Sequence, residues 1–248
     1  MHNVAPSRAL ARRSRQLLAL ALVIGALGAF IVALGILMIM IPLVAEGSGS
    51  FTIYNLLRDG LVVFGALLFL VALGVAIRAA TWRTDNDLAH EVGRYLGKTL
   101  DARYTLIRNV SRRDLGYVDA ILVGPPGVLV FRLIPDKGVF ANEGANWMRQ
   151  NQKGEWLPWR ISPTREIVAD IQKLRSYLSR INLSDVPVYG VIVFMKEQPA
   201  VQLMAKEPVV PLTHLGTLIP NIQESYFARD RIDAGKVSNT VRSLYARE

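Results

Sequence analysis

The chain has 248 residues, 51% of them hydrophobic, and carries 29 basic and 20 acidic side chains for a net charge of +9. It contains no cysteine, which excludes disulfides and thiolate metal sites and is compatible with a reducing cytosol. Six basic and two acidic residues precede Trp82, so the remainder has 23 basic and 18 acidic residues, a bias too weak to indicate nucleic-acid binding by itself.

Two long apolar runs lie near the amino terminus. No charged residue occurs between residues 17 and 45 or between residues 61 and 77. About 20 apolar residues span the core of a bilayer, and the first run is too long for the apolar core of a signal peptide. The sequence therefore predicts transmembrane helices at residues 17–45 and 58–81, joined by a short extracytoplasmic loop at residues 46–57. The lipid bilayer is the first expected partner.

Basic side chains flank these two runs and predict how the spans are oriented in the membrane. The flanking arginines are Arg8, Arg12, Arg13, Arg15, Arg78 and Arg83, whereas the connecting loop has no basic residue. Lys and Arg accumulate on the cytoplasmic side of short loops. We therefore expect a multi-pass protein of the cell membrane, with a basic cytoplasmic amino terminus at residues 1–16 and a cytoplasmic domain at residues 82–248.

The chain after Trp82 alternates between helical and strand patterns. Helices are expected from Thr84 or Asp85 to Asp101, from Ser162 to Ile181 with Pro163 in the first turn, and from about Asp230 to Tyr245. Apolar runs predict the main strands at residues 104–110, 117–123, 128–134 and 186–194. Short elements are expected at 139–159 and 209–222. This order predicts an α/β domain.

The most specific motif is the stretch GYVDAILVGPPGVLVF at residues 116–131. With an acidic residue in a first helix, a later G-x-F and Trp, a Pro-led helix and a buried strand, the chain resembles the nuclease-related domain (NERD) over roughly residues 88–194. The resemblance implies a restriction-endonuclease-like fold of the PD-(D/E)XK superfamily, with a central mixed β-sheet flanked by helices. It also implies a Mg²⁺-dependent nuclease site, in which an Asp and an acid-x-Lys pair hold the metal and the attacking water.

Carried over residue by residue, this site has degenerated. Asp119 matches the family's Asp and Glu91 matches an acid in the first helix, but Arg132 and Ile134 replace the acid and the lysine, and Glu166 stands where the family usually has Gln. A guanidinium repels a metal cation, and isoleucine offers water no donor or acceptor. We therefore expect no catalytic residue, metal or cofactor. The predicted function is a non-catalytic binding or scaffold module that recognises nucleic acid or a cytoplasmic protein.

The turn between the two motif strands decides what Arg132 contacts. A turn centred between Pro125 and Pro126 would place Asp119 opposite Arg132, so that an ion pair would occupy the former metal position. Arg132 and Ile134 would share one face of the strand. The two prolines disfavour the usual two-residue turn, so a bulge could instead shift the register and leave Arg132 as a solvated edge residue.

The alternative function is a membrane-tethered, Mg²⁺-dependent nuclease with relocated catalytic residues. Asp136, Lys137 and Glu143 follow the degenerate positions and would supply a new acid and lysine. Pro135 breaks the strand just before them, which favours a solvated turn instead.

Two further groups of residues could contact a ligand. Arg108, Arg112 and Arg113 form the best basic cluster and are candidate contacts for a phosphate of nucleic acid or lipid, although a solvated loop is the commoner role of such residues. Trp147, Trp156, Trp159 and Tyr189 are candidates for stacking on bases, but aromatic residues beside strands more often pack in the core.

Overall fold

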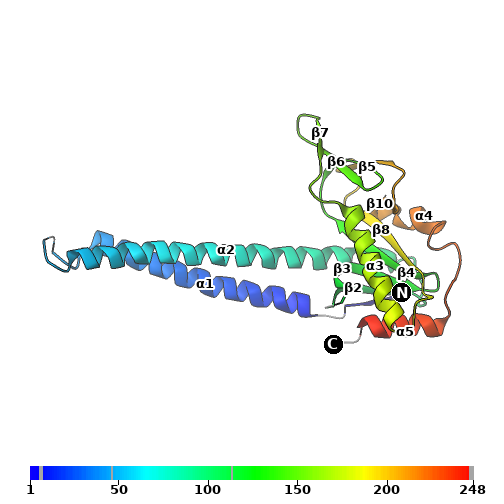
Figure 1. The fold of residues 1–248 in the computed structure, drawn as a ribbon, viewed down its shortest axis with the longest axis horizontal. Helices are drawn as coiled ribbons and strands as arrows, with labels where there is room; N and C mark the ends of the chain where they lie inside the picture. The colour runs from blue at the N-terminus through cyan, green and yellow to red at the C-terminus, as the bar shows by residue number, and fades with distance from the viewer. Residues whose placement is uncertain (6–7, 46, 113, 246–248) are drawn as a thin grey trace. The chain divides into compact units, whose positions relative to one another are not determined.

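The computed structural model describes residues 1–5, 8–45, 47–112 and 114–245, without the side chains of residues 8–13 and 82–86 (Figure 1). The chain divides into two compact units, Ala9–Thr84 and the combination of Met1–Arg8 with Asp85–Glu248. Each unit has its own packing and is described by itself.

The first unit is a pair of long apolar helices. Helix α1 covers Arg8–Met40, and α2 covers Phe51–Leu96, continuing into the second unit. Both are long and apolar enough to cross a membrane, over Ser14–Met40 and Phe51–Thr81. The helical segments differ from those expected, because α2 begins within the predicted loop and runs without a break into the predicted next helix. A membrane boundary need not coincide with a helix end.

Glycines bring α1 and α2 into close contact. A Cβ atom added to Gly28 would lie 2.8 Å from the carbonyl oxygen of Gly65, and one added to Gly65 would lie 2.7 Å from that of Gly28. Only glycine allows the two backbones to approach this closely. Two polar groups also connect the helices: the hydroxyl of Ser14 donates to Ala79 O at 2.9 Å, and that of Tyr54 donates to Met38 O at 2.6 Å.

A mixed six-stranded sheet forms the centre of the second unit. In spatial order its strands are β1 (His2–Val4), β2 (Thr105–Arg112), β3 (Gly116–Gly124), β4 (Gly127–Ile134), β8 (Val188–Phe194) and β10 (Leu212–His214). Strands β2, β3 and β4 are antiparallel, and β8 runs parallel to β4. Nearly unbroken burial along β3, β4 and β8 explains their continuous apolar sequences. The expected mixed sheet and α/β class are confirmed.

Helices cover both faces of this sheet. Helix α3 (Pro163–Arg180) packs through Ile167, Ile171 and Leu174 against Ile121 and Val130, in a core that α5 (Ala234–Tyr245) also joins. On the other face, the end of α2 and the short helix α4 (Leu218–Gln223) pack against residues that alternate with those of the first face. Asp119 and Arg132 therefore point to the face that α3 covers.

Strand β1 was not predicted. It pairs in parallel with β2, placing His2 opposite Thr105 and Val4 opposite Ile107. The ammonium group of Met1 donates to Leu100 O at 3.0 Å. The extreme amino terminus is therefore an edge strand of the main sheet.

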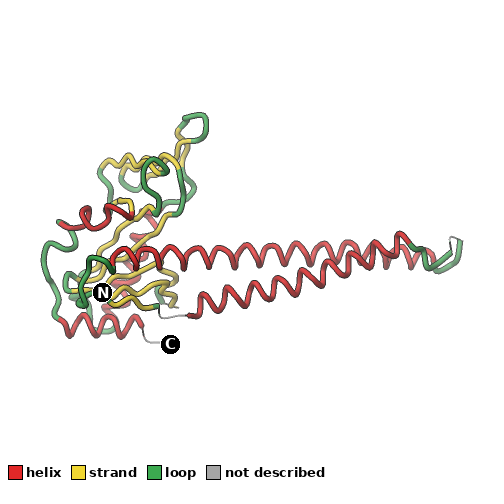
Figure 2. The backbone as a smooth tube through the Cα atoms, turned by 180° about the vertical axis from the view of Figure 1, so that it is seen from behind, coloured by secondary structure: helices red, strands yellow, loops and turns green. Residues whose placement is uncertain are grey.

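A second sheet has four strands and lies beyond the amino-terminal end of α3 (Figures 1 and 2). In spatial order these are β7 (Trp156–Pro158), β6 (Asn146–Gln150), β5 (Gly138–Glu143) and β9 (Val201–Lys206). The indole nitrogen of Trp147 donates to the hydroxyl of Thr164 at 2.9 Å, and Ser162 Oγ donates to Ala145 O at 3.3 Å. These bonds fasten the second sheet to the start of α3.

Candidate functional site

The β3–β4 hairpin has the register that a turn centred on its two prolines predicts. Gly124 pairs with Gly127 and Ala120 with Phe131, so only Pro125 and Pro126 lie between the paired strands. The prolines do not shift the register, and Gly127, the first residue after them, adopts a positive φ of 125°, which glycine tolerates. A Cβ atom there would also lie 2.5 Å from Pro187 O.

The Asp119 carboxylate lies where the ladder between β3 and β4 ends. The ladder closes with the pair of Ala120 and Phe131, and beyond it the backbone N–H of Leu133 donates to Asp119 Oδ2 at 2.8 Å. The Asp119 carboxylate, rather than a backbone carbonyl of β3, thus accepts the hydrogen bond from Leu133. Asp119 is only 6% exposed, so its charge is held in a poorly solvated position.

Arg132 supplies the positive charge at this position. Its Nη1 atom lies 3.6 Å from Asp119 Oδ2, and its Nη2 atom forms an ion pair with Glu166 Oε2 on α3. The Arg132 side chain is 19% exposed, and its Nε atom is buried without a hydrogen-bond partner in the described chain. Arg132 is therefore no solvated edge residue: it joins a strand carboxylate to a helix carboxylate, and the predicted ion pair is present.

The position expected for the catalytic lysine belongs to the core. Ile134 is 4% exposed and packs in the same apolar cluster as Ile167 and Ile171 of α3. It follows Arg132 on the same face of β4, as the alternation of side chains requires. No proton donor is present at this position.

Asp170 is a member of the site that the sequence did not lead us to predict. It lies one turn after Glu166 on α3 and is 8% exposed. Burial raises the pKa of Asp170, whereas the charges of Arg132 and Lys173 lower it. The helical spacing of Glu166, Asp170 and Lys173 would have placed all three on one side of α3.

Glu91 is not part of this group. It belongs to the last turns of α2, where Ala89 and Val92 pack against Ala120 and other residues of the opposite sheet face. The structure thus brings together Asp119, Arg132 and Glu166 and places Glu91 on a helix over the other face.

The grouped residues do not fit a magnesium ion. Mg²⁺ needs oxygen ligands in an octahedron, and the Arg132 guanidinium occupies the space beside both carboxylates. Among the described residues, no group of three or more His, Cys, Asp or Glu side chains is arranged to hold a metal.

The relocated acids of the alternative site have other partners. Asp136 Oδ1 lies 3.8 Å from Nη1 of Arg149, and Glu143 Oε1 lies 2.9 Å from the ammonium of Lys206. Lys137 contributes its carbonyl oxygen, which accepts from Arg149 at 2.8 Å. These contacts hold the acids in different ion pairs around the second sheet.

Arg108 and Arg112 of the basic cluster make contacts within the domain. Nε of Arg108 donates to Asn3 Oδ1 at 2.7 Å, and burial lowers the pKa of this guanidinium. Nη1 of Arg112 donates to Ser243 O at 2.7 Å, and its guanidinium lies 5.0 Å from the centre of the Tyr177 ring. Arg113 lies outside the described residues.

The candidate stacking aromatics divide between core and surface. Trp147 is 5% exposed, and its ring lies 5.7 Å from that of Trp159. Tyr189 makes an edge contact with Tyr226, at a centroid distance of 5.7 Å. Trp156 is the most exposed of the three tryptophans, at 36%.

Comparison with known proteins identifies the domain that carries this group. Residues 85–195 match the family model of the nuclease-related domain, NERD. The match extends from the end of α2 past β8 and includes Asp119, Arg132 and Glu166. No curated protein and no solved structure matches the chain.

Proposed function

We propose that this chain, which carries a nuclease-related domain behind two apolar helices, is a membrane-anchored binding module that has lost metal-dependent catalysis. The observation that carries the proposal is Arg132, which lies between Asp119 and Glu166 where a metal and its acidic ligand would be needed. Metal-dependent phosphodiester cleavage needs a cation and an activated water. Arg132 repels the cation, and Ile134 cannot position the water.

The guanidinium also gives the acidic group a structural role. It compensates Asp119 and Glu166, and its charge lowers the pKa of the buried Asp170. A metal ion would have to displace the Arg132 guanidinium, which would then lose its acidic partners. The ion pairs therefore keep the nuclease-like fold while removing its metal site.

The location proposed for the module is the cytoplasmic face of the cell membrane. The arginines before the first span and after the second support this orientation. The pairing of β1 with β2 supports the presence of two spans, because both strands must lie on the same side of the membrane, but it does not select the cytoplasmic side. Nucleic acid and cytoplasmic proteins would be accessible partners there.

The test is cleavage and metal binding by the purified full chain. We expect no cleavage of DNA or RNA with Mg²⁺ or Mn²⁺, and no saturable binding of either metal by calorimetry. Cleavage that Asp119→Ala abolishes would overturn the proposal, with Asp114→Ala, a nearby acid paired with Arg180, as the control. Cleavage abolished by Asp136→Ala or Lys137→Ala would instead support the relocated nuclease site.

A further inference from the structure

We infer that a cavity on the second sheet binds a nucleoside phosphate, such as a free nucleotide or a nucleotide unit of a single strand. The inference rests on the proposed function, because it names the ligand class of a module that binds without cleaving. The cavity is separate from the Asp119 group and includes none of its residues.

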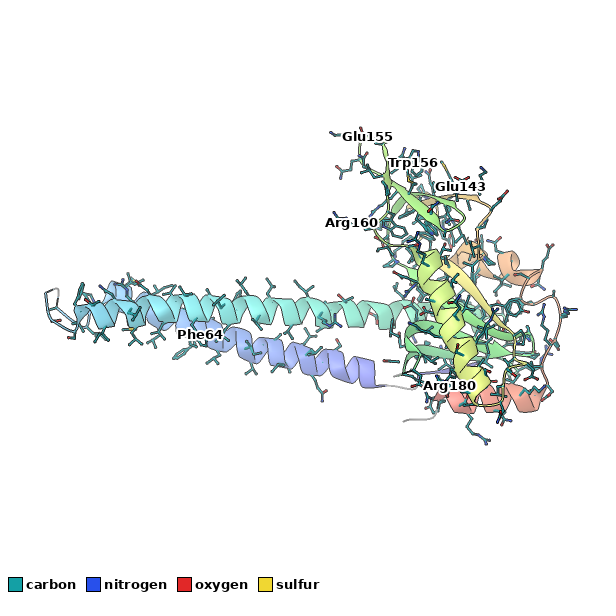
Figure 3. All side chains as sticks on the ribbon, in the orientation of Figure 1. Phe64, Glu143, Glu155, Trp156, Arg160 and Arg180 are labelled. Atoms are coloured by element: carbon teal, nitrogen blue, oxygen red, sulfur yellow. The ribbon has the colours of Figure 1, made fainter. Side chains whose placement is uncertain are left out.

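The cavity has the size and position of a ligand site. It encloses about 840 Å³, at the upper end of the range for small-molecule pockets. Strands β5, β6 and β9 and the segment from Pro158 to Arg165, which leads into α3, form its walls. Arg160 and Glu143 are labelled beside this sheet in Figure 3.

The charges around the cavity favour an anion. The carboxylate of Glu143 is already paired with Lys206 at 2.9 Å, so these two charges offset one another. Arg160 and Arg165 also line the cavity, and neither forms an ion pair with any described residue. Two guanidinium groups are suited to a phosphate, because each can donate two parallel hydrogen bonds.

The first turn of α3 adds to this preference. The Ser162 hydroxyl donates to Ala145 O and does not cap the helix. The positive end of an 18-residue helix therefore adjoins the same cavity without a side-chain acceptor from its N-cap.

The remaining walls suit a flat ring. Half-buried Trp159 lines the cavity, and its ring is supported by Phe140 at a centroid distance of 4.8 Å. Met148 and Met204 add apolar, polarisable surface. Stacking on an aromatic ring tolerates any base. A phospholipid headgroup would offer the phosphate without the ring.

A buried amide in the wall is incompletely bonded. Asn142 is 3% exposed and donates from Nδ2 to Gly144 O and Asn146 O, but its Oδ1 has no partner among the described residues. A buried acceptor without a donor is costly, and a ligand that donates a hydrogen bond to it would remove this cost. Nucleobases and ribose both carry hydrogen-bond donors that suit such an acceptor.

The experiment measures binding of two probes to the full chain in detergent. One is a fluorescein-labelled ten-nucleotide thymidine strand, followed by polarisation, and the other is a fluorescent adenosine diphosphate. The double variant Arg160→Gln/Arg165→Gln should weaken binding about tenfold or more. For the strand, the slope of log affinity against log salt concentration should fall by about 0.7 for each phosphate that the variant no longer neutralises.

The matched control is Arg94→Gln/Arg242→Gln, which removes two exposed charges away from the cavity and should leave both affinities within about twofold of the parent. Binding of the strand alone identifies nucleic acid as the source of the phosphate, and binding of both probes identifies a nucleotide. Absence of binding to both, or equal weakening in both double variants, overturns the inference. Neither result affects the proposed function, which depends on cleavage and metal binding at Asp119.

Discussion

Replacing Arg132 by Met tests the central interpretation, because it removes the cation and keeps most of the apolar stem. Asp119, which is 6% exposed, would lose its contact with the Arg132 guanidinium, and Glu166 would lose its ion pair. Removing one member of a buried pair costs about 3 to 5 kcal/mol. Because Glu166 is 43% exposed and water screens part of the interaction, we expect a loss of about 2 to 3 kcal/mol in the free energy of unfolding.

This loss should lower the unfolding temperature by about 5 to 10 °C for a domain of this size. The assay is thermal unfolding of the full chain in detergent, followed by tryptophan fluorescence. Three of the four tryptophans, Trp147, Trp156 and Trp159, lie in or beside the second sheet and report on the domain.

The deficit should depend on pH. Burial already raises the pKa of Asp170, and removing Arg132 removes a charge that lowers it. A carboxyl group whose pKa is higher in the folded state stabilises the fold at low pH, and this contribution is lost as pH rises through the folded pKa. The difference between Arg132→Met and the parent should therefore be largest near neutral pH and shrink as the pH falls toward about 5.

Two further variants make the result decisive. Asp119→Asn keeps an acceptor for the Leu133 N–H, so combining it with Arg132→Met should recover part of the missing stability. Arg103→Met also removes a guanidinium that contacts two carboxylates, but these pairs are exposed and the change should be small. An Arg132→Met variant as stable as the parent, or no recovery in the double variant, would refute the reasoning.

Three other predictions follow from packing and chain direction. Gly190→Ala should cost about 1 to 3 kcal/mol in urea unfolding, because the new Cβ would lie 2.6 Å from Cδ1 of Ile171; parent-like stability would show that α3 can move away. A peptide fused to Met1 should lower the unfolding temperature, because fusion removes the Met1 ammonium group, which donates to Leu100 O at 3.0 Å. The control is a fusion at the carboxy terminus. Since the chain has no cysteine, Ser48→Cys should react with an impermeant maleimide on intact cells and Ser238→Cys only after permeabilisation; the reverse pattern would invert the proposed orientation.

The central strands could be predicted because several local signals agree. Unbroken apolar runs are typical of strands covered on both faces, whereas the two prolines left the register of the β3–β4 hairpin open. Of the two registers considered, the structure has the one centred between the prolines, in which Asp119 and Arg132 lie close together. The partner on α3 depends on tertiary packing: Glu166 was identified only through the family resemblance, and Asp170 was missed.

Other features lack a local signal. Strand β1 has only three residues, too few for a periodic pattern, and its partner lies about a hundred residues away. Strand β9 is mostly exposed, so no buried face imposes an alternation of apolar and polar residues on its sequence. The second sheet joins segments on either side of α3 and β8, which only the folded chain brings together.

The position of β1 also imposes an order on synthesis. His2–Val4 is synthesised before β2, which follows only after both apolar helices have been made. At about 5 to 20 residues per second, this delay lasts about 5 to 20 seconds. Strand β1 can pair only after β2 has been made, so His2–Val4 remains unpaired during this delay. In the proposed membrane topology, both spans are therefore made and inserted before the first strand can find its partner.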